Sequence, residues 1–231
     1  MTSRVVPGFL PSTSGFRFPN SFPHVPVRQI GIPGVISIPI GDASNGLCGG
    51  MAFAVRDYFD AGRTPPADTT PPGQGALFDY LVDRLFESFD LPFGPARYLQ
   101  LMSPLLPDGD TLWTRLGLAP HGRAWRMIKQ EWPKVRRDID DGLPSPLGLV
   151  RVKSHDPRDL KENHQVLAYG YELVGSSLTL RVYDPNKPGR DDATLSLGIG
   201  DPTRPASVRM FPAGAPVFAF FRVTYRAGSP P

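Results

Sequence analysis

The stretch NGLCGGM, residues Asn45–Met51, contains Cys48, the single cysteine of the 231-residue chain. A glycine-bearing loop turns here into a helix predicted over Cys48–Asp60, which ends at Ala61-Gly62. The cysteine therefore heads a helix, where free N–H groups and the positive end of the dipole stabilise a thiolate. A free cysteine is also a common buried apolar residue, so position alone leaves a structural role open.

Two downstream segments predict a β-hairpin. Residues His164–Tyr171 and Leu178–Tyr183 are rich in β-forming residues, and Gly175-Ser176-Ser177 between them is typical of a turn. Antiparallel strands align their outer ends, so we expect His164 and Asp184 to meet at one edge of the sheet. A carboxylate in that place can hold the imidazole in one tautomer and stabilise its protonated form.

Cys48, His164 and Asp184 thus offer a nucleophile, a base and an orienting group in that chain order. Each has a simpler interpretation. A strand histidine can be satisfied by its neighbours, and Asp followed by Pro is a common turn sequence. If Asp184 is only a turn former, Asn186 is the nearest other candidate to orient the imidazole.

These motifs resemble those of the papain-like cysteine peptidase superfamily, including its bacterial bacteriocin-processing branches. The resemblance is carried by LCGGMA at Leu47–Ala52, NHQVLAYGY at Asn163–Tyr171 and LRVYDPN at Leu180–Asn186. It implies a papain-like α+β fold, with a helical N-terminal half headed by the nucleophile helix and an antiparallel β-rich C-terminal half. By this resemblance, Cys48 is the nucleophile, His164 the general base and Asp184 the orienting residue.

The chain departs from the papain pattern just before the cysteine. Papain-type enzymes place a glutamine there as an oxyanion donor, whereas residues 41–45 read GDASN. Asn45 is the best substitute, because its amide could donate beside the backbone N–H of Cys48, although Asn45-Gly46 is also an ordinary turn. Gly49 and Asn163, next to Cys48 and His164, complete the predicted oxyanion and substrate-binding residues.

The sequence therefore predicts a cysteine-dependent hydrolase that cleaves an amide, peptide, isopeptide or ester bond through an acyl-enzyme thioester. One alternative is a non-catalytic papain-like binding module in which Cys48 is structural. Another is an acyltransferase or transglutaminase-like enzyme that passes the acyl group to an amine. An Asp in the third catalytic position is similar to what such relatives carry.

The chain is expected to divide into an arm and one catalytic domain. Residues 1–40 hold many Pro and Gly among apolar residues, which predicts an extended arm whose later part packs on the body. Residues 41–231 form the catalytic domain, with a helical lobe over 41–142 and a β-rich lobe over 143–231. Helices first and strands second indicate an α+β fold.

Further elements follow from hydrophobic periodicity and turn residues. Helices are expected at Ala76–Phe89, Pro95–Met102, Trp113–Leu118 and around Trp125–Ile139. The last is expected to have a basic, solvated back formed by residues from Arg123 to Arg137, and a kink or interruption at Pro133. Besides the hairpin, strands are expected at Leu147–Val152, Ala193–Leu197, Val208–Phe211 and Val217–Tyr225.

Composition excludes several other classes of function. A net charge of +3, from 25 basic against 22 acidic residues, does not favour a nucleic-acid partner. One cysteine cannot form an intrachain disulfide, and no apolar run resembles a signal peptide or approaches the roughly 18 residues of a membrane span, so a soluble cytoplasmic protein is expected. The histidines His24, His121 and His155 lack zinc-type spacing, and no nucleotide-binding loop is present, so no metal or cofactor is predicted.

Overall fold

The computed structural model describes residues 1–24, 30–32, 35–38, 43, 46–91 and 93–231. Its helical segments are α1 (Pro11–Ser14), α2 (Cys48–Asp60), α3 (Ala76–Ser88), α4 (Phe93–Met102), α5 (Leu112–Arg115), α6 (Arg123–Trp125), the π-helix η2 (Arg126–Glu131), α7 (Trp132–Asp140) and the 3₁₀-helix η3 (Pro157–Glu162). Its strands are β1 (Thr2–Val5), β2 (Ile30–Ile32), β3 (Val35–Ile38), β4 (Ser145–Val150), β5 (His164–Val174), β6 (Ser177–Tyr183), β7 (Thr194–Gly198), β8 (Arg209–Phe211) and β9 (Ala219–Arg222). The fold is α+β, as the order of the sequence patterns predicts.

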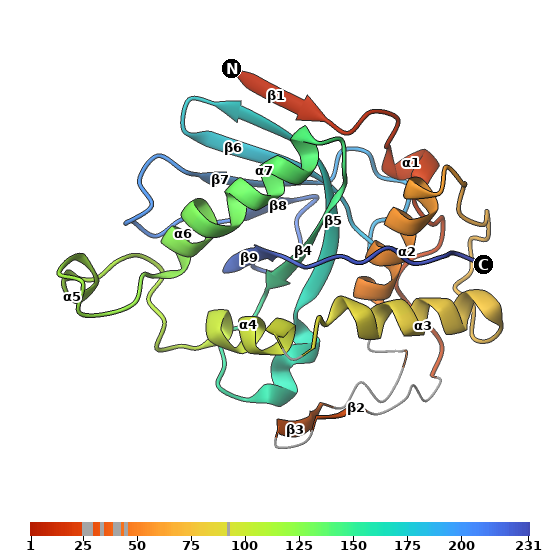
Figure 1. The fold of residues 1–231 in the computed structure, drawn as a ribbon, viewed down its shortest axis with the longest axis horizontal. Helices are drawn as coiled ribbons and strands as arrows, with labels where there is room; N and C mark the ends of the chain where they lie inside the picture. The colour runs from red at the N-terminus through yellow and green to blue at the C-terminus, as the bar shows by residue number, and fades with distance from the viewer. Residues whose placement is uncertain (25–29, 33–34, 39–42, 44–45, 92) are drawn as a thin grey trace.

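An antiparallel sheet forms the centre of the molecule, in the strand order β8-β7-β6-β5-β4-β9 (Figure 1). The predicted hairpin is β5 and β6, joined at Gly175, whose φ of +57° lies in the left-handed region that favours glycine. In its register Leu167 lies opposite Tyr183, so His164 and Asp184 extend beyond the pairing at the same end. This confirms the hairpin and the shared edge.

The N-terminal segment contributes more to the body than the sequence indicates. Strand β1, which the sequence did not predict, pairs antiparallel with the later part of β5. The buried side chains of this segment include Phe9, Phe16, Phe18 and Phe22. The structure thus describes how residues 1–24 pack on the body. The predicted packing of the later arm falls on residues 25–40, most of which, with all the side chains from 25 to 42, lie outside the described residues.

The periodicity of helix α2 predicts one buried face. In the structure, the helix is buried almost all round. Residues 49–58 are all buried, because α3 and β5 both pack against this helix. The packing against α3 is so close that a Cβ on Gly50 would lie 2.0 Å from the carbonyl oxygen of Leu81. Two charged residues of α2, Arg56 and Asp57, are buried as a consequence.

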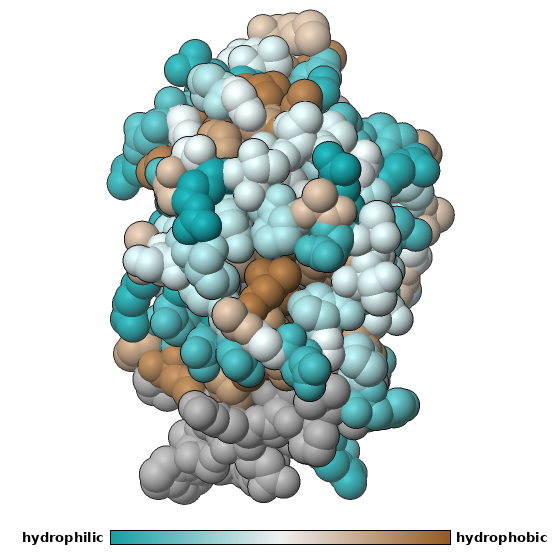
Figure 2. All heavy atoms as spheres, turned by 90° about the vertical axis from the view of Figure 1, so that its right-hand side faces the viewer, coloured by the Kyte–Doolittle hydropathy of each residue, from teal (hydrophilic) through white to brown (hydrophobic). Residues whose placement is uncertain are grey.

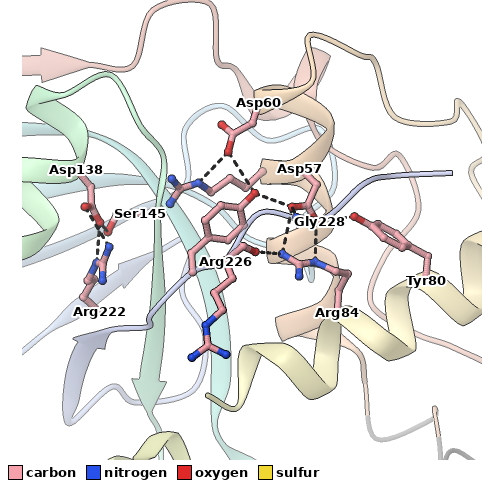
Figure 3. A network of polar contacts seen from close by, with 11 residues as sticks. Asp57, Asp60, Tyr80, Arg84, Asp138, Ser145, Arg222, Arg226 and Gly228 are labelled. Atoms are coloured by element: carbon pink, nitrogen blue, oxygen red, sulfur yellow. Dashed lines mark hydrogen bonds and ion pairs between the residues drawn. The ribbon is translucent and has the colours of Figure 1, made fainter. Parts of the chain in front are cut away.

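Buried Asp57 is compensated by donors from α3 and from the C-terminal tail that follows β9 (Figure 3). Arg84 Nε lies 2.7 Å from Asp57 Oδ2, and Tyr80 donates a hydrogen bond to the same oxygen. Tyr225 and the backbone N–H of Gly228 donate to Asp57 Oδ1 at 2.6 and 2.8 Å. The tail is thereby fixed along α2 and α3, because a buried carboxylate without donors is strongly destabilising.

Figure 2 shows the face on which α1, α2, α3 and the C-terminus lie. Hydrophilic residues cover most of it, and the apolar residues near its centre lie in a recess and not on a raised patch. No helix among the described residues is long and apolar enough to cross a membrane.

The basic helix differs from its predicted form in two ways. The buried Arg123 does not belong to a solvated face: its guanidinium donates to the backbone oxygens of Leu101, Leu106 and Ser103 and pairs with Asp108. At Pro133 the helical chain continues but is irregular, because the π-helix η2 passes directly into α7. Proline has no N–H to donate to the preceding turn of an α-helix, and the wider turns of the π-helix just before it accommodate the missing hydrogen bond.

One hydrophobic core of described residues runs from Val6 to Val223 and includes residues of α2, α3, α7 and the sheet. The expected lobe boundary at 142–143 falls between α7 and β4. Helix α7 packs against β1, β4, β5 and β9, and Trp132 meets Tyr171 edge to face at 5.1 Å. The last helix of the N-terminal half therefore covers the sheet of the C-terminal half (Figure 1).

We expect Gly50→Ala to destabilise the protein by about 1–3 kcal/mol or more, because its methyl group would overlap the Leu81 carbonyl and push α2 from α3. Urea unfolding measures this change. Gly198→Ala, where nothing lies within 4 Å of the added Cβ, is the matched control and should change stability little. Equal midpoints for the two variants would contradict the close packing.

Candidate active site

Cys48 is the first residue of α2 and is partly exposed. The first turn of the helix contains no acidic residue, so no carboxylate there opposes the positive end of the helix dipole. The two glycines that follow allow the helix to start against its neighbours: a Cβ on Gly49 would lie 2.2 Å from Ser88 Oγ and 2.8 Å from Gln165 Nε2. The sequence Cys-Gly-Gly thus combines a partly exposed cysteine with a helix start that lies close against the side chains of Ser88 and Gln165.

His164 and Asp184 form the predicted pair. His164 begins β5, Asp184 directly follows β6, and His164 Nε2 lies 2.7 Å from Asp184 Oδ1. The two side chains are 4% and 2% exposed, so water screens the interaction little. Because Asp184 occupies Nε2, the ring nitrogen that remains for the thiol is Nδ1.

The thiol of Cys48 and the imidazole of His164 lie close enough for each to shift the pKa of the other. Burial acts to raise the pKa of the thiol, whereas hydrogen bonding to His164, the charge of His164 and the backbone N–H groups of Gln165 and Gly49 act to lower it. The net pKa of Cys48 is below its ordinary value. The structure therefore brings the thiol, the imidazole and the carboxylate together in one place.

The pKa of His164 changes in the opposite direction. Burial acts to lower it, but the hydrogen bonds to Asp184 and Cys48, and the charges of both, raise it to about 9. Burial acts to raise the pKa of Asp184, whereas the hydrogen bond and charge of His164 and the backbone N–H of Asn186 act to lower it. The net pKa of Asp184 is below its ordinary value. A lowered thiol pKa and a raised imidazole pKa favour a thiolate–imidazolium pair at neutral pH.

The turn after β6 holds Asp184 in place. The backbone N–H of Asn186 donates to Asp184 Oδ1 at 2.9 Å, and that of Lys187 donates to the Asp184 backbone oxygen at 2.8 Å. The Asn186 amide nitrogen lies 3.4 Å from His164 Nε2. Asp184, at 2.7 Å, is therefore the hydrogen-bond acceptor of the ring, and Asn186 supports Asp184 through its backbone N–H.

Three residues were predicted to bind the oxyanion or the substrate. Asn45 lies outside the described residues. The backbone N–H of Gly49 is directed at the Cys48 sulfur. Asn163 is used structurally: its Oδ1 accepts from the Arg151 N–H at 3.0 Å and its Nδ2 donates to the Leu160 oxygen at 3.1 Å. These bonds hold the chain at the start of β5, directly before His164.

Sequence reasoning missed three residues around the pair. Tyr98 of α4 donates to the His164 backbone oxygen at 3.3 Å, and Gln165 Nε2 donates to Ser88 Oγ at 3.2 Å. Asn20, from the N-terminal segment, accepts a hydrogen bond from the backbone N–H of Leu47, next to the thiol. All are long-range contacts, and no local pattern in the sequence indicates them.

No group of three or more His, Cys, Asp and Glu side chains that could hold a metal occurs within the described part of the chain. No protein-family model, curated protein or solved structure matches the chain.

We expect His164 to titrate at about 9 by NMR, above the 6.5 of an ordinary histidine. Since its pKa is raised on folding, protonated His164 stabilises the fold fully below pH 6.5, and this contribution is lost as the pH rises through about 9. Cys48→Ser removes the thiolate charge and should lower the pKa of His164. A wild-type value near 6.5, or no change in the variant, would contradict the assigned contacts.

Proposed function

We propose that the protein is a cysteine-dependent hydrolase that cleaves an amide, peptide, isopeptide or ester bond through an acyl-enzyme thioester. The observation that carries the proposal is the contact chain from Cys48 through His164 to Asp184, with a lowered thiol pKa and an imidazole pKa raised to about 9. This is the arrangement that an activated nucleophile needs: a thiolate, an adjacent base and a group that orients the base.

In the acylation step, the Cys48 thiolate attacks the carbonyl carbon, forming the C–S bond and moving an electron pair onto the carbonyl oxygen. When the tetrahedral intermediate collapses, the C–N or C–O bond breaks and the leaving group takes the proton of the His164 imidazolium. In deacylation, neutral His164 accepts a proton from water as the hydroxyl attacks the thioester. The carboxylic acid leaves, and the thiolate–imidazolium pair is restored.

Asp184 stays ionised throughout this cycle. Its pKa is lowered, and its hydrogen bond to Nε2 fixes the tautomer that leaves Nδ1 for the thiol. The developing oxyanion needs donors near the sulfur. The first N–H groups of α2 are directed toward this end of the helix, and the backbone N–H of Cys48 is the donor that we assign to the oxyanion.

We further propose that the fold is papain-like. Support comes from the order of the parts along the chain and from their packing. A buried helix headed by the cysteine packs against β5 of an antiparallel sheet, and that sheet supplies the histidine and then the aspartate. The resemblance of the motifs around Cys48, His164 and Asp184 to that superfamily agrees with this arrangement.

Acyl transfer to an amine is the second candidate, since the acylation step would be identical and only the acceptor would differ. The observation that favours it is the aspartate at the third position, at 2.7 Å from His164. Adding a primary amine during turnover of an ester tests it: product partition toward the amide indicates a transferase, and unchanged acid formation indicates a hydrolase.

The proposal is tested with two general probes, iodoacetamide and p-nitrophenyl acetate. An activated thiolate reacts with iodoacetamide rapidly near neutral pH, and acylation by the ester gives a burst of p-nitrophenolate. In a non-catalytic binding module, a structural Cys48 would react slowly until the protein unfolds. No burst together with slow alkylation would therefore remove the hydrolase and favour the binding module.

We expect Cys48→Ala to abolish the burst with little change in melting temperature, because alanine is well tolerated at a helix start. His164→Ala should reduce the burst rate by about 10³-fold or more, and the double variant should be no worse than the poorer single variant. Stopped-flow kinetics measure these losses. Losses that multiply in the double variant would mean that the two residues act independently.

Asp184→Ala should lower the burst rate by about 10²–10⁴-fold, since the ring loses the partner that fixes its tautomer. Asp184→Asn retains a hydrogen-bonding oxygen without the charge, so its loss should be smaller. Stopped-flow kinetics measure the burst rates of the two variants, and calorimetry measures their melting temperatures. A wild-type rate in Asp184→Ala would deny Asp184 a catalytic role and leave Asn186 as the orienting group.

A further inference from the structure

Asn20 joins the two parts of the candidate site, although it lies 28 residues before the cysteine. Its Oδ1 accepts a hydrogen bond of 2.6 Å from the backbone N–H of Leu47, the residue directly before Cys48. Its Nδ2 donates to Asn186 Oδ1 at 3.1 Å. Its own backbone N–H donates to the oxygen of Pro185 at 3.0 Å. One side chain thus bridges the start of α2 and the turn that follows Asp184.

The contact with the nucleophile loop is tight. Gly46 has a φ of +93°, which favours glycine, and a Cβ at this position would lie 2.6 Å from Asn20 Nδ2. Leu47 is 1% exposed, so its N–H has little access to water and needs a partner in the protein. Asn20 supplies that partner at the cap position of α2.

At its other end, the bridge reaches the histidine and the aspartate. Asn186 accepts the bond from Asn20, while its backbone N–H donates to Asp184 Oδ1 and its amide nitrogen lies 3.4 Å from His164 Nε2. A continuous chain of polar contacts therefore connects the residue before the thiol with the partners of the imidazole.

The segment that carries Asn20 is firmly held. Phe16 and Phe18 are buried and stack at 4.9 Å, and Phe16 meets Tyr58 of α2 edge to face. Ser12 donates two hydrogen bonds to the Asp191 carboxylate, from its backbone N–H and its hydroxyl. Because packing has already ordered the segment, the Asn20 amide is preorganised where it bridges the site.

We propose that Asn20 is a positioning residue of this active site, and that residues 6–24 are a working part of the enzyme and not a removable pro-segment. The inference rests on the function proposed above. Asn20 holds the Cys48 sulfur at the spacing from His164 that the thiolate–imidazolium pair requires. A misplacement of about 1 Å can cost on the order of 10²-fold in rate.

Asn20→Ala tests the proposal in the full-length protein. We expect the p-nitrophenyl acetate burst to slow by about 10- to 100-fold. The pKa of Cys48, read from the pH dependence of iodoacetamide alkylation, should move up toward its ordinary value. Ser3→Ala is the matched control: it changes an exposed residue of β1, in the same N-terminal region but outside residues 6–24, and should keep the wild-type rate and pH profile.

Asn186→Ala breaks the same bridge from its other end and provides a second variant if Asn20→Ala does not fold. The double variant should lose no more than about the poorer single variant, because both changes remove one interaction. Melting temperatures are recorded for all the variants. A purely structural role would lower the melting temperature and leave the alkylation pH profile unchanged.

The outcomes separate this inference from the function on which it rests. A wild type without a burst, whose thiol titrates like a free cysteine, overturns both proposals. An active wild type with Asn20→Ala matching Ser3→Ala in rate and pH profile overturns the role of Asn20 alone. A folded Asn186→Ala variant whose alkylation rate depends on pH as in the wild type also overturns the role of the bridge from Asn20.

Discussion

The close approach of α2 to β5 and α3 is the constraint on which the site depends. Gly50 faces the backbone carbonyl of Leu81 at a distance that leaves no room for a Cβ, and Gly49 lies close against the side chains of Ser88 and Gln165. With side chains at these two positions, the helix would have to move outward by the width of a methyl group. The Cys48 thiol would then lose its contact with the ring of His164. Close packing of the interior thus sets the geometry of the chemistry.

Burial and pairing act together at the site. His164 and Asp184 are nearly inaccessible to water, where an isolated charge is costly, so each stabilises the charged form of the other. The thiol of Cys48 takes part in this mutual stabilisation. Its negative charge raises the pKa of the imidazole, and the imidazolium lowers the pKa of the thiol. The pair is consequently poised to exchange a proton near neutral pH.

Both terminal segments of the chain secure the helix that carries the nucleophile. The N-terminal segment reaches its start, where Asn20 bonds Leu47, and the C-terminal tail reaches its later turns, where Tyr225 and Gly228 bond Asp57. Interactions at both ends limit the ways in which α2 can shift relative to the sheet. Under the proposed function, a thiol held in this way would lose little entropy when it attacks a bound carbonyl.

Local sequence patterns predicted much of the fold. Helix α2 begins and ends where its glycines and periodicity indicate, and α3 and α4 lie within two residues of their predicted bounds. The strands after residue 145 follow their β-rich runs, and the hairpin turn at Gly175 brings His164 to Asp184. The predictions failed where tertiary packing overrides local pattern. Thr2–Val5 is a strand because the later part of β5 offers it an edge. Arg123 is buried because carbonyl oxygens from the end of α4 and from the loop that follows α4 accept its hydrogen bonds.

The sequence by itself determined the candidate nucleophile, base and carboxylate, because a lone cysteine at a helix start and a hairpin with outer polar residues are local features. Only the tertiary structure decided how the thiol is activated and held. The contact between Cys48 and His164, the backbone donor at Gln165 and the bridge from Asn20 to Asn186 join residues that are far apart along the chain. Such contacts depend on how helices and sheet pack in three dimensions, and neither periodicity nor residue spacing encodes that packing.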